Sequence, residues 1–210
     1  MPSIPKMLSL SLAILGLTSL AHSTPFQPLA PAPAPAPAPA GSKTTLFEPT
    51  MYRVFPSQPT FAMDPASDLH IQSFNNQSIL ENIAVFENVP ATAKRCTLGW
   101  SQAALAERDT FIVDGSGLLS VQQLPRLPDG AITWAAITPI VAEAVADGDP
   151  VSTPDMTSWP DIETAENHIN GPMDCAETIY LKVRIDGRNG DGFVYMGQND
   201  KNGLTITVQM

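Results

Sequence analysis

Short runs of alternating or β-branched residues recur after residue 46, and clusters of Gly, Asn, Asp and Pro separate them. Such runs closed by turn residues are typical of a sandwich or barrel. The sequence therefore predicts an all-β domain, an antiparallel β-sandwich with one or two short helices in its connections. The predicted strands span residues 69–74, 83–87, 96–100, 110–113, 179–185, 193–198 and 204–210.

The last three of these runs follow one another closely, so we expect them to form a meander of neighbouring strands. In the final run, apolar residues and threonines alternate strictly from Leu204 to Val208. Because side chains alternate between the two faces of a strand, the apolar residues are predicted to face the core and the threonines to face away from it.

Two segments favour helices in the connections. Residues 101–108 contain good helix formers, and residues 138–146 could form one or two turns starting at Pro139, since proline suits the first helical position. The second segment lies in residues 127–181, which contain ten acids and no Lys or Arg. We interpret residues 127–181 as a long, irregular, acidic excursion.

The N-terminus indicates export. Lys6 precedes an apolar run from Met7 to Leu20, and small residues follow it, so residues 1–23 are predicted to be a cleaved signal peptide. This run is shorter than the ~20 residues that span a bilayer. Residues 24–45 are rich in Pro and Ala and are expected to form a disordered, polyproline-like linker. The β-sandwich domain is then expected over residues 46–210.

Both cysteines, Cys96 and Cys175, lie in the mature part of the chain. An even pair in an oxidising compartment is more often a disulfide than two free thiols. A bridge between these two distant cysteines would lower the conformational entropy of the unfolded chain. On the chain-entropy model this stabilises the folded chain by roughly 4 kcal/mol. We therefore predict a structural disulfide.

The charge of the chain excludes some partners. The formal net charge of −10 becomes −11 when Lys6 leaves with the signal peptide. Nucleic acids and anionic membranes attract Lys and Arg, so an acidic chain is not expected to bind them. No later stretch is long and apolar enough to span a membrane. The sequence predicts a secreted chain, extracellular or at the cell wall.

The region from about residue 47 to 210 resembles a fungal family, the ubiquitin-three-binding protein But-two, C-terminal domain. The resemblance rests on a strand followed by Asn88-Val89-Pro90, a second strand led by Cys96, a late strand preceded by Cys175, and the secreted, Pro-rich context. It implies a β-sandwich domain in a fungal extracellular protein. The family supplies no catalytic residues that could be carried over.

Few residues suggest chemistry. A catalytic Ser or Cys needs a nearby base, but His70 and His168 accompany no nucleophile motif. Two paired cysteines and two distant histidines offer no zinc ligand set. We expect no catalytic residue, cofactor or metal, with calcium on acidic loops as the alternative. The residues of that alternative are Asp147, Asp149 and Asp155, or Asp186, Asn189 and Asp191.

Three aromatic residues are candidates for binding sugar rings: Trp134, Trp159 and Tyr195. Packing in the core is the more common role of such residues in a β-sandwich. Asn76-Gln77-Ser78 is an N-glycosylation sequon, which predicts a glycan at Asn76 in a surface turn.

We therefore expect a secreted, non-enzymatic β-sandwich module that binds cell-wall carbohydrate or an extracellular protein, or that has a structural role. Two alternatives remain open at this point. One is a small extracellular polysaccharide hydrolase that uses acids of residues 143–177 as general acid and base. The other is a secreted effector that binds a host protein.

Overall fold

The computed structural model describes residues 41–149 and 151–210. The predicted signal peptide and residues 24–40 of the predicted linker lie outside the described residues. The first strand, β1 (Lys43–Leu46), begins before the predicted domain boundary at residue 46. It does so because Lys43 pairs with Gln209 near the end of the chain, so the last residues of the predicted linker belong to a sheet.

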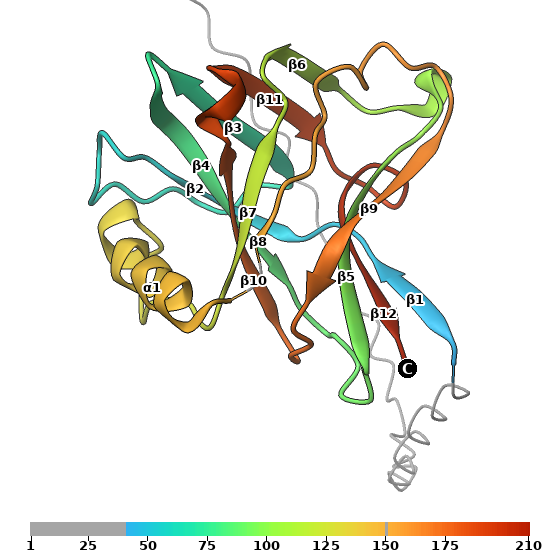
Figure 1. Cartoon of the computed structure of the whole chain (residues 1–210), viewed down its shortest axis with the longest axis horizontal. Helices are drawn as coiled ribbons and strands as arrows, with labels where there is room; N and C mark the ends of the chain where they lie inside the picture. Colours follow the sequence, from blue (N-terminus) through green and yellow to red (C-terminus); the bar gives the residue numbers. More distant parts are fainter. Residues whose placement is uncertain (1–40, 150) are drawn as a thin grey trace, which may run out of the picture. The chain divides into compact units, whose positions relative to one another are not determined.

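Two antiparallel sheets form the predicted β-sandwich (Figure 1). The remaining strands are β2 (Thr50–Val54), β3 (Asp68–Phe74), β4 (Gln77–Phe86), β5 (Arg95–Gln102), β6 (Phe111–Gly115), β7 (Leu119–Leu124), β8 (Val151–Ser152), β9 (Glu166–Met173), β10 (Ile179–Ile185), β11 (Gly192–Gly197) and β12 (Gly203–Gln209). The four-stranded sheet has the order β1-β12-β5-β9. The eight-stranded sheet has the order β6-β11-β3-β4-β10-β7-β8, and β2 pairs with β4.

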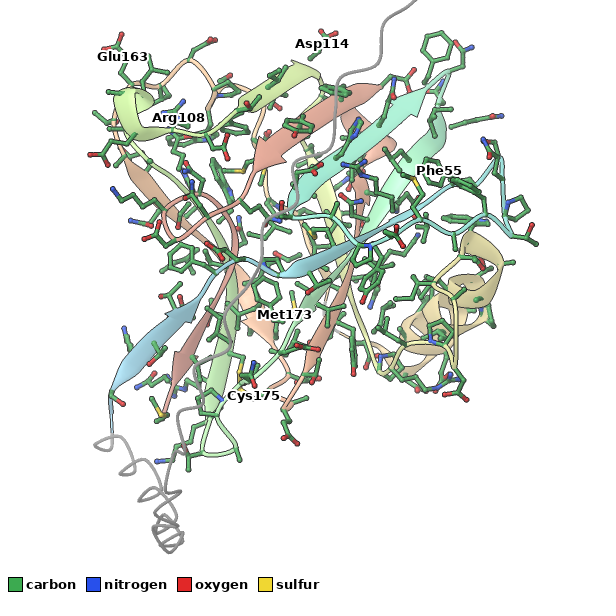
Figure 2. All side chains as sticks on the ribbon, turned by 180° about the vertical axis from the view of Figure 1, so that it is seen from behind. Phe55, Arg108, Asp114, Glu163, Met173 and Cys175 are labelled. Carbon is green, nitrogen blue, oxygen red and sulfur yellow. A yellow bond between two sulfur atoms is a disulfide. The ribbon has the colours of Figure 1, made fainter. Side chains whose placement is uncertain are left out.

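The main core contains apolar side chains from both sheets. Trp100 of β5 packs there with Leu119 of β7 and with Met173 of β9, which is labelled in Figure 2. The alternation predicted for the last strand is confirmed, since Leu204 and its apolar successors are fully buried in this core. Burial of apolar surface is the main force that holds the two sheets together.

A smaller apolar cluster lies under the helix α1 (Trp134–Asp147). Thr133 caps the helix by accepting a hydrogen bond from the Ala136 amide at 3.2 Å, and Gly148 ends it in a left-handed conformation. The buried face of α1 packs against β4 and β7. The cluster contains Val54, Ile83, Val85, Leu124, Ile137, Ile140 and Ala144.

An ion pair is buried beside this second cluster. Lys182 Nζ of β10 lies 2.7 Å from Glu81 Oε2 of β4, and both side chains are almost fully buried. The Trp134 ring of α1 covers the ammonium group, with its centroid 4.9 Å from Nζ. Because a buried charge is costly unless it is paired, Lys182 and Glu81 depend on each other.

Strand β4 has two partners along one edge. Its first half pairs with β3, and its second half pairs with β2. Where β3 leaves the edge, the Asn82 side chain takes the place of a main-chain partner, because its Oδ1 accepts a hydrogen bond from the His70 amide at 2.7 Å. This buried side chain therefore satisfies a donor that the ladder leaves free.

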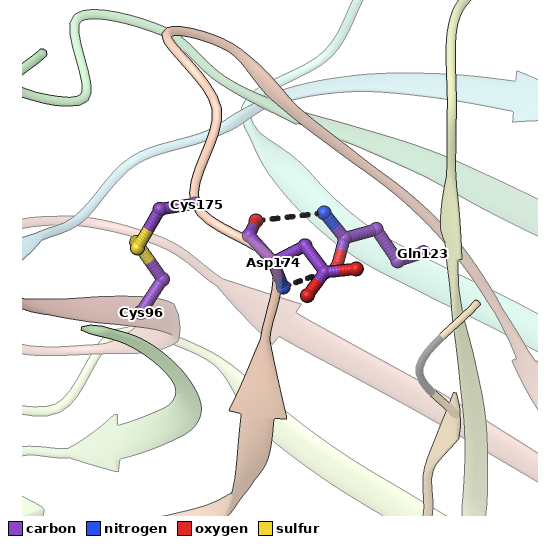
Figure 3. The surroundings of a disulfide bond; sticks show 4 residues. All are labelled: Cys96, Gln123, Asp174 and Cys175. Atoms are coloured by element: carbon purple, nitrogen blue, oxygen red, sulfur yellow. Dashed lines mark hydrogen bonds between the residues drawn. A yellow bond between two sulfur atoms is a disulfide. The ribbon is translucent and has the colours of Figure 1, made fainter. Parts of the chain in front are cut away.

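The predicted disulfide between Cys96 and Cys175 is present, with a Cα–Cα distance of 5.3 Å (Figure 3). It joins β5 of the four-stranded sheet to the segment that leads into β10 of the eight-stranded sheet. Beside it, the Gln123 side chain of β7 donates to the Asp174 carbonyl and accepts from the Asp174 amide, both at 2.9 Å. The segment that crosses between the sheets is thus fixed on two sides.

The predicted meander is wrong. The strand β10 lies between β4 and β7, β11 lies between β3 and β6, and β12 lies between β1 and β5. These three consecutive strands therefore do not pair with one another. Alternation identifies the buried side of a strand but carries no information about its neighbours, which are set by contacts between distant segments.

The predicted helix over residues 101–108 is shorter than expected, because β5 continues to Gln102 and only Leu105–Glu107 form a 3₁₀ helix. Pairing of β5 with β9 overrides the local helix preference here. The second predicted helix is confirmed, but it begins at Trp134, and Pro139 lies within it. The region of residues 127–181 is therefore not irregular, since it contains α1, β8 and β9.

Candidate functional site

Two of the three candidate aromatic residues have covered rings. Trp159 is half-buried and makes edge contacts with Trp100 at 5.8 Å and with His168 at 4.0 Å. Trp134 packs over Lys182 and belongs to the cluster under α1. These contacts favour the packing role for both tryptophans.

The third candidate, Tyr195, lies on the side of β11 that faces away from the main core. Its neighbours along the strand, Val194 and Met196, are fully buried in that core. Tyr195 pairs across strands with His70 of β3 and Ile112 of β6. Tyr195 is half-buried and Ile112 is 49% exposed, so this side of the three strands is open to solvent.

Three rings meet on this side. The His70 ring makes edge contacts with the rings of Phe193 and Tyr195, at centroid distances of 5.2 Å and 5.6 Å. Phe193 and Tyr195 are two positions apart on β11 and therefore project from the same face, about 7 Å apart along the strand. We call these three rings with Ile112 the aromatic face.

Burial lowers the pKa of His70 below its ordinary value of 6.5. The positive charge of Arg53 lowers this pKa further, and the nearby carboxylate of Asp68 opposes the shift. Arg53 and Asp68 form an ion pair with each other. Because the pKa is lowered, the His70 imidazole is neutral at pH 7 and can both donate and accept a hydrogen bond.

A hollow of about 210 Å³ adjoins the aromatic face. Phe193 belongs to both, and Gln72 of β3 and Asp114 of β6 line the hollow beside it. Asp114 is labelled in Figure 2 and is exposed on β6, which is an edge strand of the sheet. The rings are therefore bordered by a carboxylate and an amide that can bond to hydroxyl groups.

Asn76 lies at the tip of the hairpin that joins β3 to β4. Asn75 and Asn76 have positive φ values of 54° and 57°, which is typical of a tight two-residue hairpin turn. The expectation that the sequon occupies a surface turn is confirmed, since Asn76 is exposed. The glycan itself remains a prediction.

His168 is half-buried beside Trp100, on the other sheet from the aromatic face. Its ring stacks on Trp100 at 3.8 Å, and its Nε2 atom is buried without a hydrogen-bond partner. Burial lowers its pKa, and Glu166 opposes the shift. These contacts give His168 a packing role beside Trp100.

Three of the acidic residues that suggested calcium have other contacts. Asp155 accepts hydrogen bonds from Thr157, Asp186 pairs with Arg188, and Asp191 accepts from the Asn76 amide. Within residues 41–149 and 151–210, no group of three His, Cys, Asp or Glu side chains is arranged to hold a metal ion.

No helix of the described ranges is long and apolar enough to cross a membrane.

Neither models of protein families nor curated protein sequences match the chain. The aromatic face is therefore the candidate site on the basis of its own geometry. Sequence reasoning identified Tyr195 but missed Phe193, although the alternation along β11 places both on one side.

Proposed function

We propose that this chain is a secreted, non-enzymatic binding module of the fungal extracellular space or cell wall, and that its aromatic face binds carbohydrate. The observation that carries the proposal is the cluster of His70, Phe193 and Tyr195, which lies on a side of the sheet that no described helix covers. The resemblance to the fungal family supports a secreted β-sandwich of this kind.

The chemistry of the face suits a sugar. The C–H groups on one side of a pyranose ring pack against aromatic rings, which combine large contact area with few rotatable bonds. Hydroxyl groups at the edge of the sugar would bond to Asp114, Gln72 and the neutral imidazole of His70. Polar contacts of this kind orient a ligand that apolar contacts hold.

The location agrees with this role. The disulfide between Cys96 and Cys175 is compatible with an oxidising, extracellular setting. The acidic charge of the chain disfavours binding to anionic polymers, so we expect the ligand to be a neutral or basic polysaccharide.

Binding of the oxidised chain from Thr24 onward to a glycan array and to isolated cell wall tests the proposal. We expect retention on one class of polysaccharide, and a roughly tenfold weaker affinity for Tyr195→Ala and for Phe193→Ala. Phe61→Ala is the matched control, because Phe61 is also exposed, at 45%, and is not part of the aromatic face. Equal binding by all variants, or retention on no polysaccharide, would contradict the proposal and favour a protein partner.

A polysaccharide hydrolase that uses acids of residues 143–177 is the second candidate, and the carboxylates gathered around Asp149 are the ones to test first. Burial raises the pKa of Asp149, and the carboxylates of Asp147, Asp174 and Glu143 raise it further. Release of reducing sugar from a polysaccharide panel, abolished by Asp149→Asn, would support this candidate. Absence of hydrolysis across the panel would exclude it for those substrates.

A further inference from the structure

The hairpin that carries the sequon also carries an exposed aromatic ring. Phe74 is 61% exposed and stands two residues before Asn76, at the position that pairs with Gln77 across the turn. A large, exposed apolar side chain at a hairpin tip gains nothing from burial in the folded chain. A glycan attached at the neighbouring sequon would cover this side chain.

The hollow described above lies at the same place. Phe74 and Asp191 both line it, and the Asp191 carboxylate accepts a hydrogen bond from the Asn76 amide at 3.0 Å. The Asn76 backbone is thus bonded to one residue of the hollow, and Phe74, which also lines it, stands two residues earlier in the chain. A volume of about 210 Å³ exceeds that of several water molecules, at about 30 Å³ each in the liquid.

Two other contacts fix the walls of the hollow. Ser73 Oγ accepts a hydrogen bond from the Gly192 amide at 3.0 Å, and the Ser116 amide donates to the Asp191 carbonyl at 2.9 Å. The hairpin, the start of β11 and the end of β6 are therefore joined around one space. A Cβ atom at Gly192 would lie 1.9 Å from the Ser116 carbonyl oxygen, so the close approach of these segments requires glycine there.

We propose that Asn76 carries an N-linked glycan whose first N-acetylglucosamine packs against Phe74, at the Asp191 side of this hollow. The apolar face of the sugar covers the exposed ring, and the polar groups of the sugar bond to the Asp191 carboxylate. The glycan then stabilises the β3–β4 hairpin. This seat does not depend on what the aromatic face binds.

Expression of the full chain in a host that N-glycosylates secreted proteins tests this seat. Intact mass before and after enzymatic removal of the glycan shows whether Asn76 is modified. Trimming to the first sugar isolates the part of the glycan that contacts Phe74. Ser78→Ala removes the sequon but keeps Asn76, and the Ser78 hydroxyl is buried without a hydrogen-bond partner, so its loss breaks no bond. Ser78→Thr keeps the sequon and is the matched control.

We expect the trimmed wild-type chain to unfold about 2 to 4 °C above Ser78→Ala. This difference should disappear when Phe74→Ala is present in both proteins, and it should persist with Phe61→Ala. An unmodified Asn76, or a difference that survives Phe74→Ala, would overturn the proposal. Polysaccharide binding by the same proteins is measured separately. Loss of the thermal difference with retained binding therefore refutes only the seat, and the reverse result refutes only the proposed function.

Discussion

Two parts of the eight-stranded sheet have a side that faces away from the main core, and they differ in what covers that side. On β4, β10 and β7 this side is covered by α1, which buries an apolar cluster and the pair of Glu81 and Lys182. On β3, β11 and β6 no described helix covers it, and half-buried rings remain there. Strands of the same sheet thus bury a stabilising cluster under α1, whereas β3, β11 and β6 form a candidate binding surface.

The difference shows why composition alone does not identify a site. Trp134 and Tyr195 are both half-buried aromatic residues beside polar groups. The Trp134 ring covers a buried ammonium group, so its contacts are internal. The Tyr195 ring has strand neighbours on its own sheet and no covering helix, so it can contact a ligand. What covers the strand decides the role of the ring.

The largest effect is expected from breaking the buried ion pair. Lys182→Ala leaves the Glu81 carboxylate buried without its partner, so it should lower the free energy of unfolding by about 3–5 kcal/mol. Urea unfolding measures this change. Arg126→Ala is the matched control, because Arg126 pairs with Glu143 of α1 at 2.8 Å in an exposed position, and such pairs contribute about 1 kcal/mol or less.

The double variant Glu81→Leu with Lys182→Met separates loss of the pair from loss of packing. Replacing a buried pair by apolar residues of similar size is often neutral or stabilising, so most of the lost stability should return. If Lys182→Ala were as mild as Arg126→Ala, the helix-covered side would not depend on this pair.

The next largest loss of stability is expected when one aromatic ring is removed, and the comparison is between a ring under α1 and a ring on the aromatic face. Trp134→Ala removes the cover of Lys182 and part of the cluster under α1, so we expect a loss of roughly 2 kcal/mol, about half the cost of a fully buried tryptophan. Tyr195→Ala should cost less than about 1 kcal/mol of stability but should weaken polysaccharide binding. Equal losses of stability in the two variants, measured by urea unfolding, would mean that the aromatic face is part of the core.

The smallest effect is expected from pH. The pKa values of His70 and His168 are lowered in the folded protein, by burial first in both cases, from an ordinary value of 6.5. The unfolded chain therefore binds more protons below about pH 6.5, and stability that is complete above this pH is lost as the pH falls through it. Thermal unfolding at pH 7.5 and 5.5 measures the change.

Variants assign this pH effect to the two regions. His168→Gln should remove the part that arises beside Trp100, and His70→Gln the part that arises on the aromatic face. A melting temperature that does not fall between pH 7.5 and 5.5, or that falls equally in both variants and the wild type, would contradict the assignment.

Local patterns predicted a large part of the fold. Alternation from Leu204 to Val208 indicated which side chains face the core, and the structure confirms it. Two cysteines in a chain with a predicted export signal indicated the bridge between Cys96 and Cys175. The acidic residues 127–181 were misinterpreted as irregular, because the strand β9 within them has no regular apolar alternation and pairs with β5, far away in the sequence.

The candidate site was predicted only in part, since Tyr195 was identified and His70 and Phe193 were not. His70 comes from a strand more than a hundred residues before β11, so no local signal connects it to Tyr195. The exposed Phe74 and the hollow beside Asn76 likewise depend on contacts among three separate segments.

The sequence by itself determined the β class, the disulfide partners, the turn at the sequon and the buried side of the last strand, because each of these depends on residue type and short-range periodicity. Only the tertiary structure decided the strand order, the helix-covered pair of Glu81 and Lys182, and the meeting of three rings on an open side. These features arise from pairing between segments far apart in the chain, and pairing of that kind is set by the fit of whole surfaces, which no short stretch of sequence specifies.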